Sequence, residues 1–208
     1  MWQILIDDGF VPFILINLIV IFSICIHELF HGLAALHQGD QTPIKTGHMT
    51  LNPLVHMGWE SIVFLFVAGV AWGAMPVNPL KFRSAKWGEV LVFAAGPLSN
   101  LALSLLSIVL IKCFFTRNPD GLPIPSFALI ILWLVALLNL KLFLLNMLPI
   151  PPLDGFGVFS KLFPALNSFK DSSYRFTVLM LILLSTFYSG LDTLASWFLS
   201  YATGVQLQ

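Results

Sequence analysis

The sequence predicts an all-α polytopic membrane protein with about four transmembrane helices, one re-entrant segment and a short β-like loop. Composition is the first reason, because 58% of the 208 residues are hydrophobic and only 10% are charged, whereas a soluble domain carries about a quarter charged residues. The second reason is a set of long uncharged runs, each comparable to the roughly 20 residues that cross a bilayer core as a helix. Both observations argue against a soluble globular domain.

Four of these runs are predicted to be transmembrane helices. A fifth run, Ser61 to Leu80, carries Gly69, Gly73, Pro76 and Pro79 in its second half, so we expect it to be re-entrant or only partly embedded. The four predicted spans are, in order, Gly9 to His27, Val90 to Ile111, Gly121 to Leu153 with Lys141 inside it, and Phe176 to Leu191 continuing past Asp192.

The segment between the first helix and the re-entrant run is polar. Pro43, Gly47, Asn52 and Pro53 punctuate it, and turn residues between such short segments favour a hairpin or an extended strand. We therefore expect a short β-like element within residues 43–56.

The distribution of basic residues predicts an orientation. Ten basic and ten acidic side chains cancel, and no basic run stands clear of the apolar segments, so we expect no nucleic-acid partner. Lys and Arg in short loops favour the cytoplasmic side. The expected topology puts most of them on one face, which predicts an outside amino terminus and a cytoplasmic end of the first helix. That face holds Lys45, Lys81, Arg83, Lys86, Lys161, Lys170 and Arg175, whereas Lys112 and Arg117 lie opposite.

The end of the first run carries the sequence His27-Glu28-Leu29-Phe30-His31. Residues four apart on a helix project from nearly the same face, so His27 and His31 can offer two imidazole nitrogens to one metal while Glu28 lies beside them. A Glu in a membrane helix costs roughly 2.5 to 3.5 kcal/mol on insertion scales and usually lines a functional cavity. The alternative is that the three side chains only hydrogen-bond neighbouring helices.

A catalytic zinc usually takes three protein ligands and leaves a fourth position for water. His37 has the spacing of the metzincin pattern HExxHxxGxxH, but that pattern needs a glycine where this chain has Ala34. At about 100 degrees per residue, a continuing helix also turns His37 away from His31. His48 and His56 lie in the polar loop and reach the site only if the loop folds back, so substrate-side or structural roles suit them better.

Asp154 is the better candidate for the third ligand. It is the only acid between Asp120 and Asp171, and it ends a long apolar run that three prolines break. Such a break frees backbone carbonyls, which is tolerated at membrane depth only beside protein or water. Asp154 is therefore expected near a polar cavity.

Several motifs in order along the chain resemble the site-2 protease family of intramembrane zinc metalloproteases. HExxH in the first helix is followed by NxxPxPxxDG, from Asn146 to Gly155, near the end of a later one. Gly96-Pro97-Leu98-Ser99-Asn100 matches the GxxxN element of that family, and the segments 50–56 and 76–79 are also similar. The resemblance covers most of residues 20 to 160.

The resemblance implies a role for each matching position. It implies one zinc ion held by His27, His31 and Asp154, with Glu28 as general base and Asn146 as a contact to the substrate or transition state. His56 is a further candidate substrate contact. We expect residues 1–208 to form a single membrane-embedded metalloprotease domain without a PDZ domain.

The predicted reaction is hydrolysis of peptide bonds in or near transmembrane segments of other membrane proteins. The expected partners are a transmembrane protein substrate and the lipid bilayer of a prokaryotic cell, and the 43–56 loop could hold an unwound substrate by strand addition. Two alternatives stay open: a cation transporter or channel whose His, Glu and Asp bind a passing ion, and an inactive protein that binds membrane helices. A transporter does not explain why HExxH and NxxPxPxxDG occur together.

Overall fold

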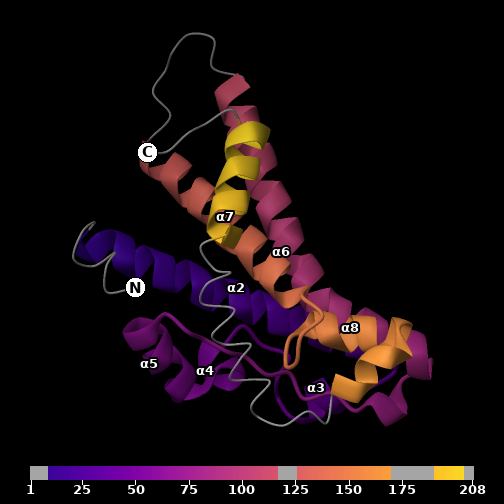
Figure 1. Ribbon diagram of the computed structural model, residues 1–208. Helices are drawn as coiled ribbons and strands as arrows, with labels where there is room; N and C mark the ends of the chain where they lie inside the picture. The colour runs from indigo at the N-terminus through magenta and orange to yellow at the C-terminus, as the bar shows by residue number, and fades with distance from the viewer. Residues whose placement is uncertain (1–8, 117–125, 170–189, 204–208) are drawn as a thin grey trace. The chain divides into compact units, whose positions relative to one another are not determined.

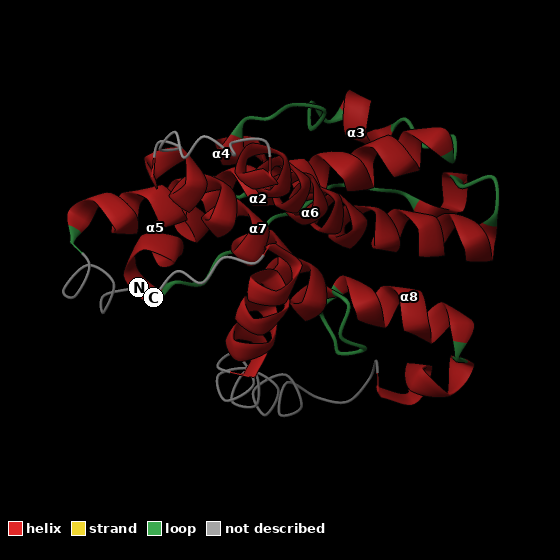
Figure 2. Cartoon of the chain, turned by 90° about the horizontal axis from the view of Figure 1, so that it is seen from above, coloured by secondary structure: helices red, strands yellow, loops and turns green. Residues whose placement is uncertain are grey.

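The computed structural model describes residues 9–116, 126–169 and 190–203. This part of the chain consists of helices and loops and contains no strand, as Figure 2 shows. The prediction of an all-helical protein is thus confirmed for the described residues. The helices are α2 (Phe10–His37), α3 (Thr42–Lys45), α4 (Pro53–His56), α5 (Gly58–Ala68), η1 (Pro79–Lys81), α6 (Ala85–Thr116), α7 (Ser126–Asn146), α8 (Asp154–Leu162) and η2 (Pro164–Phe169), followed by helical residues 190–203.

Three of the described helices are long and apolar enough to cross a membrane. They cover Phe10–His37, Ala85–Phe114 and Phe127–Asn146. Their exposed surfaces carry large apolar side chains such as Phe22 and Leu106, as lipid contact requires. The chain is therefore a membrane protein. The fourth predicted span, 176–191, lies outside the described residues except at its last two positions.

The chain forms two compact units, Met1–Ser99 and Asn100–Gln208. In the first unit, α3, α4 and α5 all contact α2, the indigo helix of Figure 1. Ile24 of α2, Met57 between α4 and α5, and Leu65 of α5 form one apolar cluster of this unit, and a second cluster contains Ala35, Phe82 and Val92. The short helices are thereby fixed to the helix that carries HExxH.

The first helix is longer than expected and holds HExxH in its interior. The uncharged run ended at His27, but α2 continues to His37 because no proline intervenes and Gly32, the weakest helix former in residues 28–37, costs only about 1 kcal/mol. The helix ends where Gly39 takes a φ of 96°, which a glycine adopts without steric strain.

The predicted β-like element within residues 43–56 is wrong. These residues form α3 and α4 with turns between them. Pro43 stands in the first turn of α3, and the Asn52 side chain accepts the Leu54 N–H at 3.0 Å as the N-cap of α4, which Pro53 begins. Proline and asparagine at such positions start helices as readily as they make turns, and here the helices form.

The run from Ser61 to Leu80 is not one helix. Its helical part belongs to α5, which has 11 residues and ends at Gly69 with a φ of 72°. A helix of this length is about 16 Å long, about half of the hydrocarbon core. It cannot cross the bilayer, and its insertion as a re-entrant segment stays a prediction.

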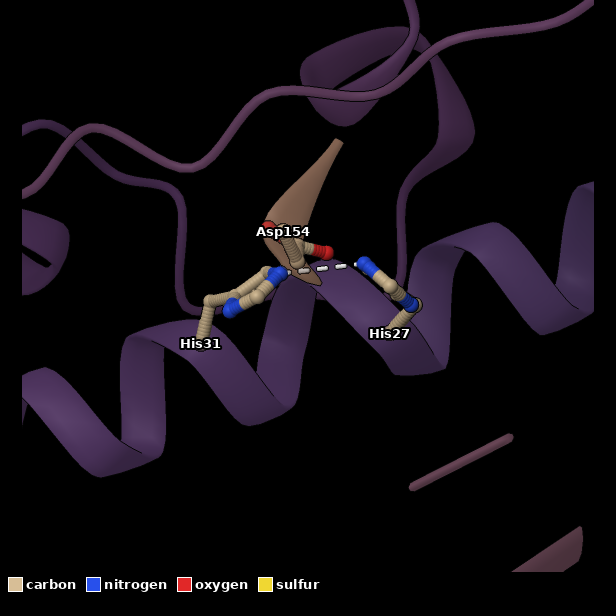
Figure 3. A group of neighbouring side chains, drawn as sticks. All are labelled: His27, His31 and Asp154. Atoms are coloured by element: carbon tan, nitrogen blue, oxygen red, sulfur yellow. Dashed lines mark hydrogen bonds between the residues drawn. The ribbon is translucent and has the colours of Figure 1, made fainter. Parts of the chain in front are cut away.

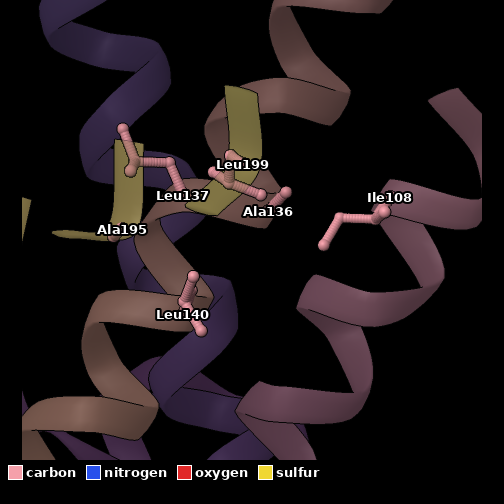
Figure 4. Packing of buried hydrophobic residues seen from close by; sticks show 6 residues of the cluster. All are labelled: Ile108, Ala136, Leu137, Leu140, Ala195 and Leu199. Atoms are coloured by element: carbon pink, nitrogen blue, oxygen red, sulfur yellow. The ribbon is translucent and has the colours of Figure 1, made fainter. Parts of the chain in front are cut away.

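The second unit packs the C-terminal part of α6, α7 and residues 190–203 together. Figure 4 shows its apolar cluster, to which all three helices contribute. Two polar bonds join α6 to α7: the Asn100 side-chain amide donates to Asn139 Oδ1 at 3.0 Å, and the Ser104 hydroxyl donates to the Ala136 carbonyl at 2.9 Å. The cluster contains Ile108, Ala136, Leu137, Leu140, Ala195 and Leu199.

Candidate metal centre

His27 and His31 lie one turn apart on α2 and are both buried, with 8% and 7% of their surfaces exposed. Their Nε2 atoms are 3.0 Å apart, and Figure 3 draws this contact as a dashed line. Two nitrogens at the usual zinc distance in a tetrahedral site would be roughly 3.3 Å apart. The pair therefore converges as two ligands of a single metal ion would.

The backbone of α6 orients one of these rings. Nδ1 of His31 lies 2.6 Å from the carbonyl oxygen of Val92, and a carbonyl can only accept, so Nδ1–H is the donor. This bond makes Nε2 the unprotonated nitrogen of His31, which is the form that binds a metal.

Gly96 of α6 leaves room between the two histidines. A Cβ built at this glycine would press on His31 Nε2 and would lie 2.5 Å from His27 Nε2. A single point that touches both nitrogens is where a metal bound to both would lie. The absence of a side chain at position 96 and the converging nitrogens thus fit a bound metal ion.

Glu28 is buried on the neighbouring side of α2, with 7% of its surface exposed. The loop after α5 approaches it so closely that a Cβ at Gly73 would lie 2.5 Å from Glu28 Oε1. A carboxylate buried beside a pair of possible metal ligands can act as a general base.

Asp154 is the first residue of α8, where the helix dipole favours a charged carboxylate. As predicted, the proline-rich stretch breaks the helix, because α7 ends at Asn146. A Cβ at Gly155 would collide with the backbone of Met147 and Leu148, so glycine is needed after the aspartate. His27 and His31 belong to the first unit and Asp154 to the second, so the assignment of Asp154 as the third ligand stays a prediction.

The remaining candidates are placed as follows. The Asn146 side-chain amide donates to the Leu142 carbonyl at 2.9 Å, within its own helix. His56 is buried, and its Nε2 lies 2.7 Å from the Thr50 carbonyl oxygen. The substrate contacts expected for Asn146 and His56 stay predictions. His37 is exposed at the end of α2, and His48 lies beside His56, with ring centroids 6.3 Å apart.

Three neighbours of this site were not identified from the sequence. Gly96, Gly73 and the carbonyl of Val92 contact HExxH from positions at least 45 residues away. Gly96 belongs to the GxxxN element, and its match was the one signal that pointed to it. Every residue has a backbone carbonyl, so nothing in the sequence indicates that the carbonyl of Val92 contacts His31.

The chain is similar to two curated proteins. It is 35% identical over 181 residues to the "Putative zinc metalloprotease YwhC" of Bacillus subtilis, and the match covers 84% of this chain and 81% of that protein. It is 29% identical over 191 residues to the "Putative zinc metalloprotease Rip2" of Mycobacterium tuberculosis, covering 85% of this chain and 66% of that one. No protein-family model and no solved structure matches the chain.

Proposed function

Because the chain belongs to the site-2 protease family and is a metalloprotease of the membrane, we propose that it hydrolyses peptide bonds in or near transmembrane segments of other membrane proteins. The observation that carries this proposal is the pair of buried nitrogens, His27 Nε2 and His31 Nε2, converging 3.0 Å apart on the space left by Gly96. This pair lies within a helix that is long and apolar enough to span a bilayer.

His27, His31 and Asp154 would hold the zinc, one ion per chain. Two neutral imidazoles and one carboxylate form a common ligand set of hydrolytic zinc enzymes. When bound, zinc supplies Lewis-acid chemistry, since it acidifies water and polarises a carbonyl group. The Val92 carbonyl keeps the His31 ring in the tautomer that this role requires.

Glu28 would move the protons of the reaction. Its carboxylate takes a proton from the attacking water and delivers it to the nitrogen of the leaving amine, so that the peptide bond breaks and the carboxylate is regenerated. Asn146 would donate a side-chain hydrogen bond to the substrate backbone or to the developing oxyanion. The bond between Asn146 and Leu142 would then have to be exchanged for the substrate.

The proposed substrate is a transmembrane helix that unwinds locally. A helix hides its carbonyls in its own hydrogen bonds, so cleavage requires an opened segment, and Gly or Pro near the cut should favour it. Residues 43–56 form α3 and α4 and so offer no strand to which an unwound substrate could add.

We also propose that the end of α2 near His37 faces the cytoplasm. Three exposed basic residues, Lys45, Lys81 and Arg83, gather near this end, since the Arg83 N–H donates to the Gln38 carbonyl at 2.8 Å and Lys81 lies 3.8 Å from Asp40. Basic loops favour the cytoplasmic side. Labelling of Lys45→Cys by a membrane-impermeant thiol reagent should require permeabilised cells, in a Cys113→Ser background.

The function is tested by measuring zinc per chain and cleavage of a transmembrane test substrate in detergent. Glu28→Gln should keep zinc and lose at least about a hundredfold in cleavage rate. Asp154→Ala and His27→Ala should lose zinc. Glu60→Gln and His37→Ala are the matched controls, because both residues are exposed. Cleavage that is indifferent to Glu28, or absence of zinc from the wild type, would overturn the proposal and favour a transporter or a helix-binding protein.

A further inference from the structure

An extended segment of the first unit lies along α2 beside Glu28. We call residues 72–78 the strap. Its Gly73 touches the Glu28 carboxylate, and two residues later Met75 packs on Gly32, where a Cβ would lie 3.0 Å from the methyl carbon of Met75. The four residues from 28 to 32 rise about 6 Å along a helix, and two extended residues cover about 6 to 7 Å. The strap is therefore stretched and runs in the same direction as α2.

The strap contains no regular secondary structure, so other parts of the unit hold it in place. The Ala74 N–H donates to the His56 carbonyl at 2.9 Å, and the Asn78 N–H donates to the Asp40 carboxylate at 2.6 Å. The anchor next to Gly73 is Ser61 of α5. These three contacts fix the beginning, the middle and the end of the strap.

Ser61 holds both backbone groups of Trp72 with one oxygen atom. Its hydroxyl donates to the Trp72 carbonyl at 2.7 Å and accepts the Trp72 N–H at 2.8 Å. Ser61 is fully buried, with 0% of its surface exposed. A hydroxyl can donate and accept at once, whereas an alanine side chain can do neither. Loss of the hydroxyl would remove both contacts that precede Gly73.

We propose that Ser61 is a positioning residue for Glu28. By holding Trp72, it sets Gly73 against the carboxylate and limits the volume in which the carboxylate moves. The inference rests on the proposed function, because it assigns Glu28 the role of general base. It adds a residue 33 positions away whose hydroxyl bonds the backbone of Trp72.

The experiment compares Ser61→Ala with Ser107→Ala, which removes a buried hydroxyl from α6. Ser61→Ala should keep the zinc content of the wild type and lower kcat on the order of tenfold to a hundredfold, with KM unchanged within about twofold, because only the base is displaced. Hydrogen exchange at residues 69–75 should become faster in Ser61→Ala, since the Trp72 N–H loses its acceptor. Ser107→Ala should match the wild type in all four measurements.

A second variant perturbs the same contact without changing Ser61. Gly73→Ala places a methyl group 2.5 Å from Glu28 Oε1, so it should also lower kcat and keep zinc. Because both variants act on one contact, their double variant should lose less than the product of the two single losses. Losses that multiply fully would overturn the inference. So would a Ser61→Ala enzyme with the kcat of wild type, with reduced zinc content or with a change confined to KM.

Failure of the inference and failure of the proposed function give different results. If Ser61 has no such role, Glu28→Gln is still inactive while Ser61→Ala behaves like Ser107→Ala. If the chain is not a zinc protease, Glu28→Gln has no effect on cleavage or the wild type binds no zinc.

Discussion

Lys141 of α7 donates to the carboxylate of Asp192 at a distance of 2.7 Å. The lysine side chain is 11% exposed and the aspartate side chain 51%, and Lys141 is the only charged residue within α7. An ammonium group that is largely removed from water is strongly stabilised by a nearby carboxylate. The pair therefore ties the helix of residues 190–203 to α7 beside the apolar cluster of Figure 4.

Removing one member of this pair should destabilise the protein more than removing both. Asp192→Leu leaves the Lys141 ammonium without this carboxylate and should lower stability by about 1 to 2 kcal/mol, less than for a fully buried pair because Asp192 is half exposed. The double variant with Lys141→Met should regain most of the loss. Thermal unfolding in detergent measures both, and a double variant that is less stable than Asp192→Leu would contradict this view.

Gly96→Ala should abolish zinc binding without unfolding the protein. The new methyl group would occupy the space between His27 Nε2 and His31 Nε2. Alanine in place of glycine inside a helix normally stabilises it by up to about 1 kcal/mol, but here the methyl group must displace two buried histidine rings, so thermal stability should fall modestly while zinc content falls steeply. Metal analysis and unfolding are measured on the same sample. Zinc at the wild-type level would show that the metal lies elsewhere.

The buried amide pair Asn100 and Asn139 should contribute to the association of α6 with α7. Both side chains are fully buried and their bond is 3.0 Å long. Replacing either residue by leucine should destabilise the protein by roughly 0.6 to 2 kcal/mol, the range of polar bonds between membrane helices. A double-mutant cycle of unfolding free energies isolates the pair, and additive losses would mean that the two residues do not interact energetically.

Acid should loosen the loops that follow α2. Burial raises the pKa of Asp40, but hydrogen bonds from the Thr42 hydroxyl, the Asn78 N–H and the Thr42 N–H, together with Lys81, outweigh burial and bring the pKa below its usual value. A lowered pKa means that the ionised form stabilises the fold above the unfolded value of about 3.9 and that this stability disappears as the pH falls through the folded pKa.

This predicts the behaviour of Asp40→Asn. At pH 7 the variant should have a free energy of unfolding about 1 to 3 kcal/mol lower than that of the wild type, and it should therefore unfold at a lower temperature. This difference in stability should shrink below about pH 4. Lys81→Met is the control with a small effect, because its ammonium is 3.8 Å away and its side chain is 45% exposed. A difference that is equal at pH 7 and at pH 3.5 would exclude the carboxylate as its source.

Local patterns in the sequence predicted the parts of the site that depend on neighbouring residues. The spacing of His27 and His31 fixes their common helix face, and the prolines before Asp154 fix the end of α7. The end of α2 was not predicted because the uncharged run stops before Glu28, whereas a single charged residue does not end a helix. The expected strand was missed because Pro43 and Asn52 suit helix starts and turns equally well.

Contacts between distant residues could not be predicted in this way. Gly96 and Gly73 leave room for side chains of α2, and only packing reveals which side chain each one accommodates. The bond between Ser61 and Trp72 also depends on how α5 and the strap fold together.

The position of HExxH within α2 also determines how far the second reactant must travel. His27 lies ten residues before the end of the helix at His37, a rise of about 15 Å. Every bond that is cut consumes one water molecule, and a water molecule is about 2.8 Å across. A file of roughly five water molecules would bridge that depth from the solvent at this end of the helix. A path of that length would make the supply of water a step of the reaction in its own right, so that turnover would depend on this supply as well as on the chemistry.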